Sequence, residues 1–162
     1  MGVSRTLSYN ATRTGVAVTV NFDSLLRKIQ KAGGDIEAAT WDAARKGGRI
    51  YYQNLVEECK RSNVPDHLID KIRFNCLRDQ SGNRYAVVVG WLMENYNPAD
   101  IADGYKVVFL NYGTPRRTTG TGADRGYIDG RGFIGRAKRK SKKPIKEAQQ
   151  NFLNDLLKGL TK

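Results

Sequence analysis

Apolar and polar residues alternate in three stretches of the chain, as expected of strands with one buried face. Two of these stretches flank the turn-forming sequence DQSGN at 79–83, which predicts a β-hairpin. The third stretch ends where Gly113 and Pro115 interrupt strand pairing. A stretch rich in Val and Thr at 15–21 has the composition of a further strand. We predict one antiparallel sheet of strands 69–78, 84–92 and 105–112, with 15–21 on its edge.

Apolar residues at helical spacing predict two long helices. Asp35 is a favourable N-cap for a helix over 36–61, whose Ala and Gly residues permit close packing against the sheet. A shorter helix precedes it and ends at Gly33 and Gly34. The last helix is expected to open near Pro144, after a helical turn at 135–140.

These elements predict an α+β fold. Its small antiparallel sheet of three to four strands carries the long N-terminal helix and the C-terminal helix on one face. A chain of 162 residues is long enough for one sizeable core. We expect a flexible N-terminus at 1–14 and a single domain over 15–162.

A long loop at 114–132 joins the third predicted strand to the C-terminal region. It has few apolar residues, and its glycines give the backbone high conformational freedom: these are Gly120, Gly122, Gly126, Gly130 and Gly132. Loops of this length inside a compact domain are usually functional or disordered. We expect 116–132 to be mobile, and Phe133 to anchor the return of the chain into the domain.

The order of motifs around this loop resembles a family of tail-component proteins of lambdoid long-tailed bacteriophages. In that family a strand ends before Gly-Thr, a variable loop follows, and a Phe-hydrophobic-x-x-Ala segment leads to a C-terminal helix. The matching positions here are Tyr112, Gly113, Thr114, Phe133, Ile134 and Ala137. The resemblance extends over most of the chain from about Phe22. Asn111 and Tyr112 depart from it, because an acidic residue is common there in the family.

This resemblance implies a structural virion protein and no enzyme. Such a minor tail, tail-completion or head–tail joining (neck) protein forms a homo-oligomeric ring, hexameric or larger, at the head–tail junction or the tail end. Its implied partners are other copies of itself and other neck or tail proteins. Its implied location is the virion after synthesis in the host cytoplasm.

The charge of the chain is uneven. Of the formal net charge of +12, +9 lies in 112–162, which holds 13 Lys and Arg against 4 Asp and Glu. The positive electrostatic field of this region favours binding to an acidic protein surface or to DNA passing through a channel. The alternatives are a merely solvated face and a basic DNA-binding protein that acts independently of a virion. The expected interface or DNA-facing residues are Arg116, Arg117, Arg125, Arg131, Arg136, Lys138, Arg139 and Lys140. Of these, the last four are expected to take no part in the fold.

The sequence predicts no catalytic site and no cofactor or metal. His67, the single histidine, has no nucleophile signature near it. Cys59 and Cys76 are expected to be buried free thiols. A small metal nuclease would need the acidic residues of several loops to converge: Asp100, Asp103, Asp124 and Asp129. No apolar run approaches the length of a membrane span, and no membrane partner is expected.

Overall fold

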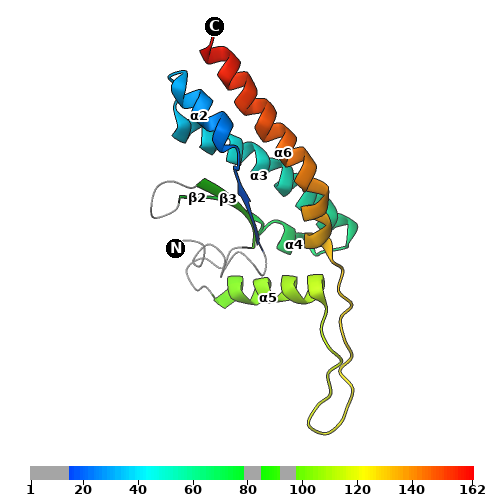
Figure 1. The fold of residues 1–162 in the computed structure, drawn as a ribbon. Coiled ribbons are helices and arrows are strands. Elements are labelled where there is room, and N and C mark those ends of the chain that lie inside the picture. Colours follow the sequence, from blue (N-terminus) through cyan, green and yellow to red (C-terminus); the bar gives the residue numbers. More distant parts are fainter. Residues whose placement is uncertain (1–14, 79–84, 92–97) are drawn as a thin grey trace.

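The computed structural model describes residues 15–78, 85–91 and 98–162. The predicted flexible N-terminus (1–14) and the hairpin turn (79–83) lie outside the described residues. The elements are β1 (Gly15–Thr19), α2 (Asp23–Lys31), α3 (Ile36–Arg61), α4 (Asp66–Ile69), β2 (Arg73–Arg78), β3 (Tyr85–Gly90), α5 (Pro98–Tyr112) and α6 (Phe133–Leu160). The fold is α+β, as predicted (Figure 1).

The sheet has three antiparallel strands in the order β1-β3-β2. Val18 of β1 lies opposite Val87 of β3, and Phe74 of β2 lies opposite Val89. Every residue of β3 is buried; strands flank it on both edges, and α3 packs against it. The two strands of the predicted hairpin are confirmed, and the stretch near residue 15 is a full member of the sheet.

Two predicted strand segments are helical. The third strand, expected at 105–112, is the second half of α5. Its buried residues Asp103, Val107 and Asn111 are spaced four apart, which is one face of a helix. The strand expected to begin at residue 69 begins at Arg73, because α4 and the following turn occupy 66–72.

α3 lies between the sheet and α6. Asp35 caps it as predicted, and the carboxylate accepts hydrogen bonds from the backbone N–H groups of Glu37 (2.8 Å) and Ala38 (3.2 Å). A Cβ at Gly47 would stand 2.8 Å from Gln149 Nε2, and one at Gly48 would stand 2.5 Å from Val87 Cγ1. The paired glycines therefore let α6 and the sheet approach the same turn of α3 from two sides.

α6 begins at Phe133, about ten residues before the predicted start, and continues through Pro144. Proline removes one backbone hydrogen bond from a helix interior. Pro144 and Lys140, whose carbonyl loses that donor, are both exposed, so water can satisfy the carbonyl. The predicted separate turn at 135–140 is the first part of this single helix.

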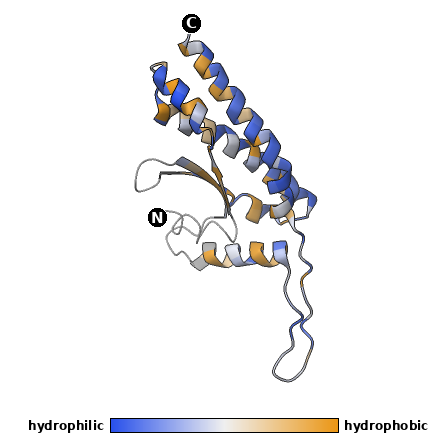
Figure 2. Ribbon diagram, viewed as in Figure 1, coloured by the Kyte–Doolittle hydropathy of each residue, from blue (hydrophilic) through white to orange (hydrophobic). Residues whose placement is uncertain are grey.

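The main core joins the sheet, α3, α4, α5 and the first turns of α6. A second cluster around Ile29 and Leu153 joins α2 to the far ends of α3 and α6. Figure 2 shows hydrophobic residues along the sheet and mostly hydrophilic residues along α6. Within the described ranges, no helix has the length and apolar character needed to cross a membrane.

Candidate interaction site

A hairpin of residues 113–132, here called the arm, leaves the body of the molecule between α5 and α6 (Figure 1). Thr114 N–H donates to the carbonyl of Ile128 (2.9 Å), and Arg125 N–H donates to that of Arg117 (2.7 Å). Thr118 and Asp124 form an antiparallel bridge nearer the tip. The expected irregular loop is thus a hairpin with backbone pairing along its length, and its mobility stays a prediction.

The base of the arm requires glycine. Gly113 has φ +82°, and a Cβ there would stand 2.7 Å from the carbonyl oxygen of Ile128. Gly130 is equally close to the other strand, since a Cβ there would stand 2.7 Å from the carbonyl carbon of Tyr112. Thr114 Oγ1 accepts a hydrogen bond from Ile128 N–H (3.0 Å). The Gly-Thr motif therefore closes the hairpin where the arm meets the body.

The two ends of the arm are fastened to each other by reciprocal capping, which we call the clasp. The carbonyls of Leu110 and Asn111 at the end of α5 accept hydrogen bonds from the N–H groups of Arg131 and Gly132 (both 2.9 Å). In return the buried Asn111 side chain accepts from Ile134 N–H (2.9 Å) in the first turn of α6. Terminal groups that a helix leaves unpaired are thus satisfied at both helix ends.

The apolar motif residues lie directly behind the clasp. Phe133 and Ala137 are fully buried, and Ile134 is nearly so. The ring of Phe133 meets that of Trp91 edge to face, with centroids 6.2 Å apart. Phe133 is therefore placed as an anchor for the return of the chain.

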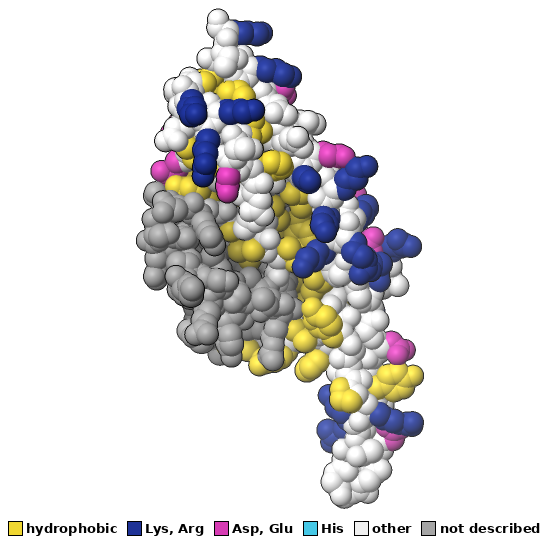
Figure 3. Space-filling view, in the orientation of Figure 1, with side chains coloured by type: hydrophobic (Ala, Val, Ile, Leu, Met, Phe, Trp, Pro, Cys, Tyr) yellow, Lys and Arg dark blue, Asp and Glu magenta, His cyan; other side chains and the backbone are white. Residues whose placement is uncertain are grey.

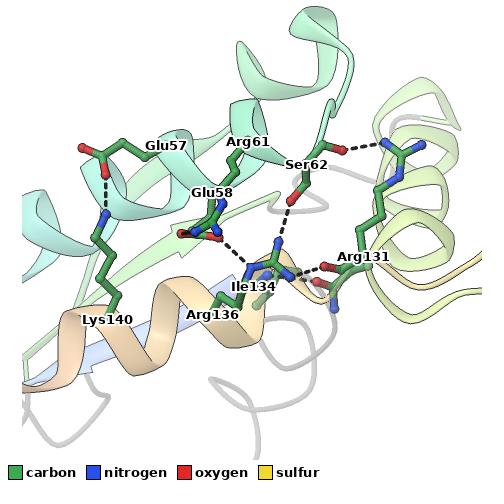
Figure 4. A network of polar contacts seen from close by, with 9 residues as sticks. Glu57, Glu58, Arg61, Ser62, Arg131, Ile134, Arg136 and Lys140 are labelled. Atoms are coloured by element: carbon green, nitrogen blue, oxygen red, sulfur yellow. Dashed lines mark hydrogen bonds and ion pairs between the residues drawn. The ribbon is translucent and has the colours of Figure 1, made fainter.

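Arg136 is part of the fold, which corrects the expectation that it acts only on partners. Its Nε donates to Glu58 Oε2 (2.7 Å) and its Nη2 to Ser62 Oγ (2.6 Å), and Nη1 donates to the carbonyl of Arg131 (Figure 4). Glu58 is only 5% exposed, so its carboxylate needs this partner. Arg136 thus joins α6 to the end of α3.

Two other predicted site residues also bind α3 or its end. Arg131 Nη1 donates to the carbonyls of Ser62 (2.9 Å) and Asn63 (2.8 Å). Lys140 Nζ lies 2.5 Å from Glu57 Oε2, with both side chains about half exposed (Figure 4). Lys140 therefore takes part in a surface ion pair, whose contribution to stability is small.

The cations of the arm tip are exposed. Arg116 Nη2 lies 2.5 Å from Asp124 Oδ2 across the hairpin. This hydrogen bond, and a second from Gly126 N–H, hold the pKa of Asp124 below its ordinary value. Arg117 and Arg125 are exposed, with no ion pair to another described residue.

Lys138 and Arg139 are exposed on α6, as are Lys142, Lys143 and Lys146. Only Lys143 of these five lies near a described carboxylate, that of Glu147 at 3.8 Å. Of the eight predicted site residues, the structure brings Arg131 and Arg136 together at the base of the arm and places Lys140 further along α6, against Glu57. It leaves Lys138 and Arg139 exposed on α6, and the other three on the arm.

An aromatic face on α5 was missed by sequence reasoning. Tyr105 and Phe109 stack with centroids 6.3 Å apart and are 44% and 39% exposed. Tyr112, at 63%, ends the same helix, and Tyr127 on the arm is 60% exposed. Helical spacing of 105, 109 and 112 was the available signal, but alternation with Val107 favoured a strand.

The remaining candidates for chemistry do not form a site. Burial, and then the neighbouring Glu58, raises the pKa of the Cys59 thiol to about 12, while Cys76 is exposed, contrary to expectation. Asp103 on α5 binds Lys71 (2.5 Å) and Lys106 (2.8 Å), whereas Asp124 on the arm binds Arg116. Within the part of the chain that the structure describes, no three potential ligands cluster as a metal site would need.

The chain was compared with protein-family models, with curated proteins and with solved structures, and none of them matches it.

Proposed function

We propose that this protein is a structural subunit of a tailed-phage virion. It is a tail-completion or neck component that forms a ring at the head–tail junction or the tail end. The motif resemblance supports this proposal, since all six motif positions gather at the base of the arm and the start of α6. Such a role requires a surface that contacts a neighbouring subunit, and it requires no catalytic group.

The observation that carries the proposal is the arm itself. It leaves the body beside α6 and ends in a polar tip with exposed arginines. A ring of identical subunits needs two different surfaces that meet head to tail and close by rotation. The arm is one such surface, and the aromatic face of α5 is an apolar surface of the kind that interfaces bury.

The test is the oligomeric state of the purified chain with a full and a shortened arm. Replacing residues 118–124 by Asn-Gly joins Arg117 to Arg125 by a tight hairpin turn. We expect the full chain to form closed rings at raised concentration, seen by light scattering and electron microscopy. The shortened variant should stay monomeric with an unchanged melting temperature. A full chain that remains monomeric throughout, or a shortened chain that still closes rings, would contradict the proposal.

A basic DNA-binding protein acting independently of a virion is the second candidate. The exposed cations of α6 favour it, because each phosphate they neutralise releases a counterion. The discriminating measurement is the salt dependence of duplex DNA binding by the monomer. A steep loss of affinity with salt favours the DNA-binding protein, and negligible affinity favours the virion subunit.

A further inference from the structure

A groove of about 530 Å³ runs between β1 and α6. Its floor is mainly apolar and includes Val16, Val18, Phe22 and Ile145. Figure 3 shows a hydrophobic strip along the body with Lys and Arg side chains beside it. At one end Gln149 Nε2 donates to the carbonyl of Thr19 (3.3 Å), so α6 lies close to the end of β1.

β1 forms one edge of the sheet. Among the residues that the structure describes, it pairs with β3 on one side and with no strand on the other. An edge strand presents unpaired N–H and C=O groups, which can accept an added strand. The groove therefore offers backbone hydrogen bonds beside an apolar floor.

The α6 wall of the groove carries a row of lysines. Lys138, Lys142 and Lys146 are spaced four residues apart, line the groove and are exposed. None forms an ion pair with a carboxylate of the described ranges. Like charges at this spacing destabilise a helix, and an anion beside them removes that penalty.

The spacing of the row suits an extended chain. Four residues of helix rise about 6 Å, and two residues of strand advance about 6.6 Å. Carboxylates at every second position of a strand beside β1 would therefore meet successive lysines. The buried Tyr51, which also lines the groove, has a hydroxyl without a hydrogen-bond partner among the described residues, so an acceptor is missing there.

We propose that this groove binds an extended acidic segment of a different protein. The segment adds to β1 as a fourth strand and places alternate carboxylates against the lysine row.

Segments of this chain are poor occupants. The arm carries four arginines and two aspartates, and residues 1–14 carry two arginines and no acidic residue. Both would be repelled by the lysines. A nucleic acid would match the lysines, but it would leave the strand edge and apolar floor unused. The inference stands whether or not the chain forms a ring.

The test is binding of a fluorescent peptide of about seven residues, with Glu at alternate positions and Val or Thr between them. Its control has the same composition with the Glu residues consecutive, so the charge is equal and only the spacing differs. We expect the alternating peptide to bind the full chain at least about tenfold more tightly, because only it matches the row. Backbone N-methylation of the peptide at alternate positions, made in both registers, should abolish binding in one of them.

Lys142→Glu and Lys143→Glu form a matched pair of variants. They are neighbours on α6 and both exposed, but only Lys142 lines the groove. We expect Lys142→Glu to weaken peptide binding about tenfold and Lys143→Glu to leave it nearly unchanged. Equal binding of the two peptides, or equal effects of the two variants, would overturn the inference. Tighter binding of a single-stranded oligonucleotide that depends on Lys142 would overturn it in favour of nucleic acid.

Discussion

At the scale of single residues, Asp103 fixes α5 to the body. Its carboxylate accepts hydrogen bonds from Lys106 (2.8 Å) on the same helix and from Lys71 (2.5 Å) in the turn after α4. These two hydrogen bonds, Lys106 first, lower the pKa of Asp103 to about 2. Asp103 is thus a charged residue on the mostly buried face of α5 that is compensated by two lysines.

Asp103 should make stability depend on acid pH. An unfolded aspartate titrates near pH 4, so the folded form, with the lower pKa, binds the proton less readily than the unfolded chain. The stabilisation is complete above about pH 4 and is lost as the pH falls towards about 2. Asp103→Asn lacks it at every pH. We expect urea denaturation to show a steeper loss of stability between these pH values for the natural chain than for Asp103→Asn, and identical slopes would refute the assignment.

In the sequence, Glu58 stands among Glu57, Lys60 and Arg61, a composition typical of a solvated helix face. The structure buries it beneath Arg136, which lies 78 positions later in the chain. Local composition cannot reveal such a pair, because burial of Glu58 is decided by where α6 crosses α3. The count of charged residues identified the basic cluster. It could not distinguish the cations that bind other parts of the fold from those that are exposed to solvent.

At the scale of elements, α5 shows how the spacing of apolar residues in a helix can be mistaken for the alternation of a strand. In YKVVFLN, apolar residues occupy both the alternating and the helical positions. β-Branched residues then favoured the strand, although Asn97-Pro98 marks a helix start. The buried spacing of Asp103, Val107 and Asn111 includes two polar residues, each satisfied by a distant partner. A search for hydrophobic periodicity alone does not recognise buried polar positions such as these as part of the core.

The long helix and the hairpin strands were predictable because their signals are local. Asp35 caps α3 through its own side chain, and the apolar run of β3 (YAVVVG) follows a turn-forming sequence. The start of α6 was not predictable in this way. The side chain that caps it belongs to Asn111, 23 positions before Ile134. Gly132, the residue directly before the helix, has no side chain that could cap it.

Arg136 and Arg139 should differ sharply in their effect on stability. Arg136→Ala leaves the buried Glu58 with only Arg61, at 3.7 Å. We expect a loss of about 2–3 kcal/mol, below the value for a fully buried pair because Arg136 is partly exposed. Arg139→Ala, at an exposed position of the same helix, should change stability by less than about 0.5 kcal/mol.

Urea denaturation of the two variants measures this difference. Both substitutions remove one positive charge from neighbouring turns of α6, so the change in net charge cancels in the comparison. Equal losses in the two variants would mean that the contact with Glu58 contributes nothing to stability.

At the scale of the whole molecule, α3 is the element against which the first and the last described elements pack. β1 and α2 near the start, and α6 at the end, all pack against it. The arm stands outside this arrangement. Its contacts with the body include the clasp, the contacts of Arg131 and the hydrogen bond from Gly113 N–H to the carbonyl of Phe109 (2.8 Å). Opening the arm should therefore leave the rest intact.

Limited trypsin treatment tests this independence. Within the arm we expect cleavage after Arg116, Arg117 or Arg125 before Arg131, because Arg131 is held by two carbonyls at the end of α3. The cut protein should elute as one species and melt near the temperature of the intact chain, since α3 and α6 stay packed. Cleavage at Arg131 at an equal rate, or separation of the two fragments without denaturant, would show that the arm is integral to the body.

The clasp has a consequence for how the reach of the molecule can vary. It joins Leu110 and Asn111 to Arg131, Gly132 and Ile134, so none of its bonds depends on how many residues lie between the two sides. One residue added to each strand of the hairpin lengthens it by about 3.4 Å, and a second restores the original facing of the side chains. Insertions made in such pairs move the tip outward and leave each contact of the body as it was. The arm therefore works as a spacer whose length is set separately from the fold that carries it.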